Sequence, residues 1–183
     1  MSWEQFCECN KTPKHLQEAS LEPGQFMPDD RVITGCKWLD KPRKSLILSG
    51  ETGRGKTYFM YCLMKGIIQR YGIHNARFFK SKQLDDRLLS DLRQYGDANY
   101  MLETVKDIPF LFLDDFGLER SGERAEREYY DIIDDRVEHR KPTIISTNLS
   151  DSDILKTFGD RIHSRLKTFV GIPFEGEDIR ESI

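Results

Sequence analysis

The chain has 183 residues, enough to bury one hydrophobic core but too few for two ordinary domains. Hydrophobic residues make up 38% of it and charged residues 32%, which excludes a disordered chain. The net charge of -3 argues against binding nucleic acid through overall charge, although a local basic strip is compatible with it. The apolar runs are far shorter than a membrane span and the N-terminus lacks a signal pattern, so we expect a cytoplasmic protein without a membrane partner.

Prolines and glycines interrupt a polar stretch over residues 1–44. This pattern predicts a loop-rich N-terminal extension with at most short helices, packed onto the core. Cys7 and Cys9, together with His15, are candidate ligands of a zinc site, but no fourth ligand is evident. Free, reduced thiols are therefore the preferred interpretation of the four cysteines.

Short apolar runs alternate with helical patterns over residues 45–183, which we expect to form a single domain. Strands are predicted at residues 45–49, 76–80, 110–114 and 143–147, with a last apolar run at residues 168–173. Helices are predicted at residues 56–71, 83–94 and 124–139, then after the capping residue Ser150, and at residues 160–166. This alternation is typical of an α/β fold with a parallel sheet.

The segment 50–57 matches the pattern G-x-x-x-x-G-K-[ST] and lies between a predicted strand and a predicted helix. Its glycines let successive backbone N–H groups face an anion, while Lys56 reaches the outer phosphates and the Thr57 hydroxyl binds Mg²⁺. A chance glycine-rich turn is the alternative, and the strand and helix on either side argue against it. The expected nucleotide-binding residues are Gly50, Glu51, Thr52, Gly53, Arg54, Gly55, Lys56, Thr57 and Tyr58.

Two carboxylates, Asp114 and Asp115, end the very apolar strand at residues 110–114, at the edge where ligands collect in parallel sheets. We expect Asp114 to hold Mg²⁺ through water and Asp115 to polarise the water that attacks the γ-phosphate. Simple capping of the strand is the alternative. The next strand ends at Asn148, whose amide is a candidate for holding the attacking water, although Asn at a strand end is also ordinary turn chemistry.

Four segments in chain order, residues 50–57, 112–117, 144–149 and 159–166, together resemble the DnaC/DnaI/IstB group of AAA+ ATPases. This group comprises bacterial replicative helicase loaders and the ATPase subunits of one class of transposon. The resemblance implies a P-loop NTPase fold: a three-layer αβα sandwich around a five-stranded parallel sheet. It also implies ATP or ADP as the nucleotide and Mg²⁺ as the metal.

The resemblance further implies self-association on ATP, with each nucleotide bound between neighbouring subunits and an arginine of one subunit completing the site of the next. Arg165 is the first candidate by motif position and Arg161 the second, and a helix with surface ion pairs is the alternative. Such an arginine contributes roughly 10³–10⁵-fold in rate. The implied partners are a replicative helicase or another replication or transposition protein, and single-stranded DNA, for which Lys80, Lys82 and Arg87 are candidate contacts.

The chain also departs from this group. Only about 44 residues precede the ATPase core, where helicase loaders usually carry a domain that grips the helicase. The region after Leu166 is short, so we expect little or no C-terminal lid, with Arg180 a candidate phosphate sensor in what we otherwise expect to be a solvated tail. A nucleotide-gated adaptor and a P-loop kinase therefore remain alternatives to an ATPase that loads helicases.

Overall fold

A five-stranded parallel sheet organises the computed structural model, which describes residues 2–22, 28–95, 99–117, 122–176 and 178. The strand order is β2-β3-β4-β1-β5, and every neighbouring pair is parallel. The strands are β1 (Leu46–Ser49), β2 (Ala76–Lys80), β3 (Phe110–Phe116), β4 (Thr143–Thr147) and β5 (Val170–Pro173). The helices are α1 (Trp3–Cys9), α2 (Lys14–Gln17), α3 (Asp29–Asp40), α4 (Lys56–Tyr71), the 3-10 turn η1 (Ile73–Asn75), α5 (Ser81–Tyr95), α6 (Asn99–Asp107), α7 (Glu123–Glu138) and α8 (Asp151–Leu166).

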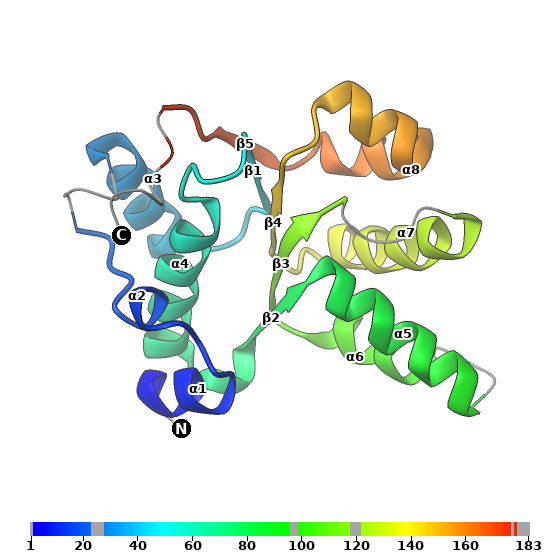
Figure 1. Ribbon diagram of the computed structural model, residues 1–183, viewed down its shortest axis with the longest axis horizontal. Helices are drawn as coiled ribbons and strands as arrows, with labels where there is room; N and C mark the ends of the chain where they lie inside the picture. Colours follow the sequence, from blue (N-terminus) through cyan, green and yellow to red (C-terminus); the bar gives the residue numbers. More distant parts are fainter. Residues whose placement is uncertain (1, 23–27, 96–98, 118–121, 177, 179–183) are drawn as a thin grey trace.

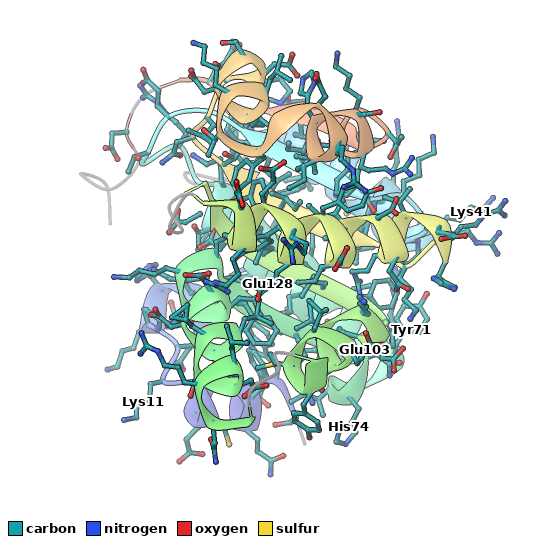
Figure 2. The ribbon with its side chains drawn as sticks, turned by 90° about the vertical axis from the view of Figure 1, so that its right-hand side faces the viewer. Lys11, Lys41, Tyr71, His74, Glu103 and Glu128 are labelled. Atoms are coloured by element: carbon teal, nitrogen blue, oxygen red, sulfur yellow. The ribbon has the colours of Figure 1, made fainter. Side chains whose placement is uncertain are left out.

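Helices cover both faces of the sheet, so the fold has three layers (Figure 1). Helices α1 to α4 lie on one face and α5 to α8 on the other, which is the face turned to the viewer in Figure 2. Alternate strand residues supply the two cores: Phe112 and Ile144 pack with α4, whereas Leu113 and Ile145 pack with α5 to α8. The predicted αβα sandwich around a five-stranded parallel sheet is confirmed, and no lid domain is evident in the described residues after β5.

The carboxyl ends of the central strands meet at one edge of the sheet. Ser49 at the end of β1 is in register with Thr147 at the end of β4, and Thr147 is in register with Phe116 at the end of β3. The loop after β1 and the polar residues that end β3 and β4 are therefore neighbours, although they lie far apart in the sequence. This edge carries the candidate site.

The N-terminal segment packs onto α4, as expected, through buried Trp3, Phe6 and Trp38. Its helical content differs from the prediction, since α3 spans 12 residues and not merely a short turn. Pro28 as N-cap and acidic residues in the first turn favour this helix, and burial of Val32 and Trp38 outweighs the weak helix propensity of Gly35. The division of the chain at residue 44 stays a prediction.

Two other elements differ from expectation in detail. Helix α6 was not predicted, and it buries Leu102 and Val105 in the same core as α5. The two helices predicted after Ser150 are joined into α8 with a kink at Gly159, whose φ of 73° is left-handed.

Within the described ranges, no helix has both the length and the apolar character needed to cross a membrane. Arg180 lies outside the described residues.

Candidate functional site

The loop between β1 and α4 has the backbone geometry of an anion cradle. Gly53 and Gly55 have φ values of 83° and 86°, a left-handed conformation that residues with a Cβ rarely adopt. Gly55 is the N-cap of the 16-residue helix α4, and no side chain caps the first N–H groups of that helix. Uncapped N–H groups and the positive end of the helix dipole both attract an anion.

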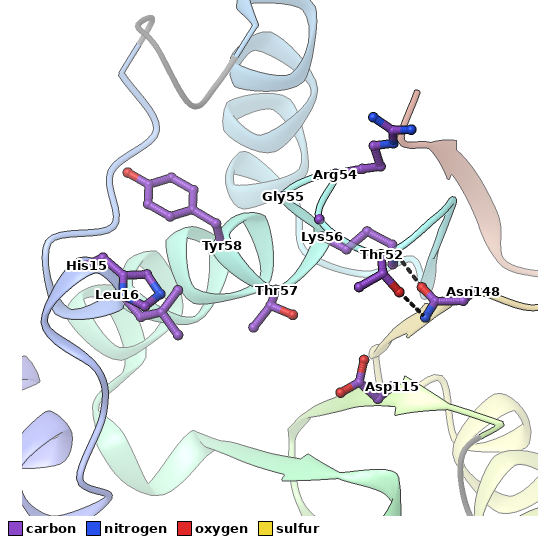
Figure 3. A pocket seen from close by; sticks show the side chains of 11 residues that line it. His15, Leu16, Thr52, Arg54, Gly55, Lys56, Thr57, Tyr58, Asp115 and Asn148 are labelled. Carbon is purple, nitrogen blue, oxygen red and sulfur yellow. Dashed lines mark hydrogen bonds between the residues drawn. The ribbon is translucent and has the colours of Figure 1, made fainter. Parts of the chain in front are cut away.

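Lys56 holds this loop against the end of β4. Its Nζ donates hydrogen bonds to the carbonyl oxygens of Gly50 (2.6 Å) and Glu51 (2.7 Å), and to Oδ1 of Asn148 (2.6 Å). The amide nitrogen of Asn148 in turn donates to Oγ1 of Thr52 at 3.0 Å (Figure 3). The ammonium group is thus fixed at the loop although the side chain comes from a helix.

Thr57 and Asp114 form an oxygen-rich pair beneath the loop. The Thr57 hydroxyl lies 3.1 Å from both carboxylate oxygens of Asp114, and Ser146 Oγ donates to the same carboxylate at 2.5 Å. Burial raises the pKa of Asp114, whereas the hydrogen bonds from Ser146 and Thr57 lower it. A hydroxyl and a buried carboxylate side by side are the oxygen ligands that Mg²⁺ prefers, so these residues fit that metal.

Asp115 is turned out of the strand by an unusual backbone conformation. Its φ is 58°, which costs about 1–3 kcal/mol for a residue with a Cβ, and its N–H donates to Ser146 Oγ at 2.9 Å. One carboxylate oxygen lies 4.0 Å from Nζ of Lys80 at the end of β2. The strained turn therefore directs the two successive carboxylates differently: Asp114 is buried, while Asp115 lines the cavity.

A cavity of about 140 Å³ joins these groups. Its walls include the loop residues 52–58, Asp115 and Asn148, and on the other side His15 and Leu16 of α2 (Figure 3). The tyrosine hydroxyl of Tyr58 accepts a hydrogen bond from the N–H of Ser20, which fixes the N-terminal segment beside the loop.

Sequence reasoning did not assign His15 and Leu16 to this site, because nothing in a segment 40 residues upstream signals its position in space. The zinc alternative had grouped His15 with Cys7 and Cys9. Cys7 is buried and Cys9 is exposed, and across the described parts of the chain no three His, Cys, Asp or Glu side chains are arranged to hold a metal.

The predicted α8 arginines, Glu51 and the candidate DNA contacts do not line the cavity, whereas Arg54 does. Arg161 stacks on the ring of Tyr130 at 3.8 Å, and Arg165 donates through Nε to Asp134 at 2.5 Å, so both α8 arginines contact α7. Glu51 and Arg54 pair with each other at 2.7 Å on the loop. Of the DNA candidates, Lys80 lies near Asp115, Lys82 is exposed, and Arg87 lies over the Phe79 ring.

Comparison with known proteins gives consistent matches. The family model of the IstB-like ATP binding protein matches residues 20–165. The chain is 34% identical over 143 residues to an insertion-sequence ATP-binding protein of Pseudomonas fluorescens, covering 75% of this chain and 58% of the relative. It is 32% identical over 132 residues to an insertion-sequence ATP-binding protein of Mycobacterium tuberculosis, covering 69% of this chain and 47% of the relative. The chain thus spans about half the length of these curated relatives.

The fold comparison agrees. The crystal structure of the DnaC helicase loader matches with a TM-score of 0.76 and 27% sequence identity, covering 89% of this chain and 100% of that one. The matched region of the family model includes the phosphate loop, the acidic end of β3 and the polar end of β4. The chain belongs to the family of IstB-like ATP binding proteins, within the DnaC/DnaI/IstB group of AAA+ ATPases.

Proposed function

We propose that the protein is a Mg²⁺-dependent ATPase of DNA replication, similar to a helicase loader, which assembles on ATP and binds single-stranded DNA. The observation that carries the ATPase part is that Lys56, Thr57 and Asp115 line one cavity, with the buried carboxylate of Asp114 hydrogen-bonded to Thr57. Binding of ATP requires only Lys56 and the Thr57–Asp114 pair. Asp115, placed in the cavity by a strained turn, favours hydrolysis over binding alone.

Each residue has a separate task in this proposal. The loop N–H groups and Lys56 bind the β- and γ-phosphates, and His15, Leu16 and Tyr58 contact the nucleoside. Thr57, and Asp114 through water, would hold Mg²⁺, which would neutralise charge on the phosphates. Asp115 orients the water that attacks the γ-phosphorus, and Asn148 supports that water. The bond from the γ-phosphorus to the bridging oxygen breaks, giving ADP and inorganic phosphate.

Three variants test the ATPase proposal. Lys56→Ala should lose both ATP binding and turnover, because it removes the cation that contacts the phosphates. Asp115→Asn should bind ATP within a few-fold of the wild type and hydrolyse it roughly 10²–10⁴-fold more slowly. Glu138→Gln removes an exposed charge at the end of α7, away from the loop, and should change neither property by more than a few-fold. Wild-type turnover by Asp115→Asn would refute the assigned role.

Assembly and DNA binding are tested together by size-exclusion chromatography with light scattering. The protein is run with ADP, with a slowly hydrolysed ATP analogue, and with the analogue plus single-stranded DNA. We expect larger assemblies only with the analogue, and a complex with DNA in which Lys82 and Arg87 of α5 contribute. If neither single-stranded DNA nor a replicative helicase changes assembly or turnover, the loader function is rejected and the ATPase proposal stands alone.

A transposition ATPase is the second candidate, favoured by the two insertion-sequence relatives at 34% and 32% identity. In this case the protein partner is a transposase, and ATP acts mainly as a switch for binding it. Addition of a transposase would then change assembly or turnover, whereas a replicative helicase would not. If ATP acts purely as a switch, Asp115→Asn should still bind the transposase and function with it. If the protein needs a cycle of hydrolysis, the same variant should assemble with the transposase and then stall.

A further inference from the structure

Strand β3 contains a β-bulge at its two carboxylates. The register of β3 against β4 shifts between residues 113 and 116. The registered pairs on either side of the shift are Leu113 with Ile145 and Phe116 with Thr147. Asp114 and Asp115 therefore lie opposite a single residue of β4, Ser146. A bulge bends the strand and interrupts its ladder of hydrogen bonds, and bulges are common next to active sites, where they redirect a side chain.

The bulge changes which face of the sheet the β3 side chains reach. Successive strand residues normally point to opposite faces. Phe112 packs in the core on the α4 face and Leu113 in the other core, yet Phe116 shares the core of Leu113 although it lies three positions further along. The bulge thus turns Asp115 to the same face as Asp114, where α4 and the cavity lie. In a regular strand the two carboxylates would lie on opposite faces.

The Ser146 hydroxyl bonds to both residues of the bulge. It donates to Oδ1 of Asp114 at 2.5 Å and accepts from the N–H of Asp115 at 2.9 Å. A hydroxyl has one proton to donate and lone pairs with which to accept, so both bonds form at once. Ser146 is 0% exposed, so water has no access to replace either bond when the hydroxyl is removed.

A serine that merely fills space in the strand is the simplest alternative. Strands buried on both faces are normally near-continuous apolar runs, and Ile144 and Ile145 follow that rule. A purely structural hydroxyl is found at Thr147, which donates to the carbonyl oxygen of Phe116 at 2.7 Å. Ser146 differs, because one of its partners is the carboxylate that we assign to the metal and the other is the backbone of the residue that we assign to the attacking water.

The backbone of Asp115 needs such support. Its φ of 58° lies in the left-handed region, which a residue with a Cβ keeps only where neighbouring contacts fix it. Its carboxylate is 34% exposed and lies 4.0 Å from Nζ of Lys80, which is a long contact between two mobile groups. The shorter bond to Ser146 acts on the backbone itself and fixes the direction in which the Asp115 side chain enters the cavity (Figure 3).

We infer that Ser146 is a positioning residue for hydrolysis, which holds Asp114 and Asp115 on one face of the sheet through a single hydroxyl. The inference rests on the ATPase activity proposed above. Ser146 is not among the residues that line the cavity, so it acts through the two carboxylates. Loss of the hydroxyl should therefore slow the chemical step and leave nucleotide binding nearly intact, because the loop and Lys56 are unchanged.

Steady-state phosphate release by Ser146→Ala tests the inference. The kcat should fall roughly 10–100-fold, as is typical when a hydrogen bond that orients a metal-binding or catalytic side chain is lost, whereas KM for ATP should stay within a few-fold. The fall in kcat should persist at saturating Mg²⁺. Recovery of the wild-type kcat at high Mg²⁺ would show that the hydroxyl serves Asp114 alone and would overturn the inference, as would a wild-type kcat at all Mg²⁺ concentrations.

Thr143→Val is the matched control, because it removes a buried hydroxyl from the start of the same strand, at the end away from the cavity. That hydroxyl accepts a hydrogen bond from Arg136, so the control should also lower the melting temperature. It should nevertheless leave kcat near the wild-type value. An equal fall of kcat in Thr143→Val and Ser146→Ala would assign the effect to stability and contradict a positioning role.

The double variant Ser146→Ala/Asp115→Asn shows whether Ser146 acts through Asp115. Two residues that act as one unit give losses that do not multiply. The double variant should therefore turn over ATP about threefold or more faster than the product of the two single losses predicts. Losses that multiply would mean that Ser146 and Asp115 work independently, which overturns the inference.

Amide hydrogen exchange, followed by NMR without nucleotide, gives a readout that does not depend on turnover. The Asp115 N–H should exchange at least about fivefold faster in Ser146→Ala, because it loses its acceptor, whereas the N–H of Leu111 in the same strand should exchange as in the wild type. An unchanged rate at Asp115 overturns the inference. Absence of ATP turnover in the wild type, with faster exchange at Asp115 in the variant, would instead refute the ATPase proposal and leave the hydrogen bond established.

Discussion

The carboxylate of Asp114 illustrates how one residue of the site opposes the stability of the fold. The residue is only 1% exposed, and among the described residues no ion pair joins it to a cation. Burial of a charge without a paired cation is unfavourable, and hydrogen bonds from Ser146 and Thr57 offset only part of it. A position that is suited to holding a metal is therefore a position where the empty protein is destabilised.

We expect Asp114→Asn to raise the melting temperature of the nucleotide-free protein while abolishing Mg²⁺-dependent ATP turnover. The amide removes the buried charge and keeps a carbonyl oxygen that accepts from Ser146. Differential scanning calorimetry and a phosphate-release assay measure the two effects. Asp115→Asn is the matched control, since its side chain is 34% exposed and should change the melting temperature little. A lower melting temperature for Asp114→Asn would contradict the argument.

The cysteines give a second residue-scale prediction. Burial raises the pKa of Cys62 to about 12 and also raises the pKa of Cys7, so both thiols stay protonated and shielded in the native protein. Cys9 and Cys36 are exposed. Brief treatment with iodoacetamide at pH 8 should therefore alkylate Cys9 and Cys36, and all four cysteines should react after denaturation, as measured by mass spectrometry.

Zinc provides the control for that measurement. If Cys9 became protected when zinc was added and reactive again after chelation, the free-thiol interpretation would be wrong. Rapid labelling of Cys62 in the native protein would instead contradict the burial of α4 against the sheet.

At the scale of elements, Arg136 connects three pieces of secondary structure. It projects from α7 and is 1% exposed. It donates to the carbonyl oxygens of Val105 (3.0 Å) in the last turn of α6, of Ile108 (2.6 Å) just after α6, and of Pro142 (2.8 Å) before β4. Its Nε also donates to the Thr143 hydroxyl at 2.8 Å. One guanidinium thus satisfies backbone groups that the ends of α6 and the start of β4 leave unpaired.

Arg136→Met should lower the free energy of unfolding by at least about 3 kcal/mol, because each buried carbonyl that loses its donor costs about 1–3 kcal/mol. Arg136→Lys should recover only part of the loss, since one ammonium cannot reach the same set of acceptors. Urea denaturation measures both. Arg93→Met, at an exposed position of α5, is the control and should change stability by less than about 0.5 kcal/mol. Equal stability of the Arg136 and Arg93 variants would refute the role of Arg136.

The elements that sequence predicted well are those whose signals are local. The bounds of α4, β2 and β4 agree with the predicted residues 56–71, 76–80 and 143–147. An apolar pattern fills the interior of each, and Gly72 marks the end of α4 while Pro142 marks the start of β4. Helices α3 and α6 were not recognised, since both depend on burial against other elements for stability.

In the candidate site, too, some residues could be predicted from the sequence and others depend on the folded chain. Lys56, Asp114, Asp115 and Asn148 come together because strand ends meet at one edge of a parallel sheet, which chain order alone implies. His15 and Leu16 reach the cavity only through the tertiary packing of the N-terminal segment. The left-handed turn at Asp115 and the contact between Lys80 and Asp115 are likewise properties of the folded chain.

At the scale of the whole molecule, the two α8 arginines lie outside the cavity of their own chain and contact α7 instead. A role in hydrolysis for Arg165 therefore requires a neighbouring copy. In the proposed assembly, such a contact would join two different surfaces of the same protein, so we expect a head-to-tail arrangement.

Mixing two inactive variants tests the shared site. Asp115→Asn and Arg165→Ala should each hydrolyse ATP poorly, whereas an equal mixture should regain roughly a quarter of the wild-type sites, those that combine an intact Asp115 with an intact Arg165. Arg161→Ala mixed with Asp115→Asn is the comparison, since it shows which arginine acts between subunits. No recovery in either mixture would indicate that neither arginine works across an interface.

The packing of α2 against the phosphate loop connects nucleotide binding to the order of the N-terminal segment. His15 and Leu16 line the cavity, and Ser20 is hydrogen-bonded to Tyr58, so a nucleotide that contacts this wall binds only while α2 is docked. By linkage, a ligand at 100 times its Kd stabilises the docked form by about 2.7 kcal/mol. Amide hydrogen exchange in α1 and α2 should slow by about a factor of 100 when ATP is added. Residues 2–20 thereby become a natural reporter of site occupancy, one that needs no label.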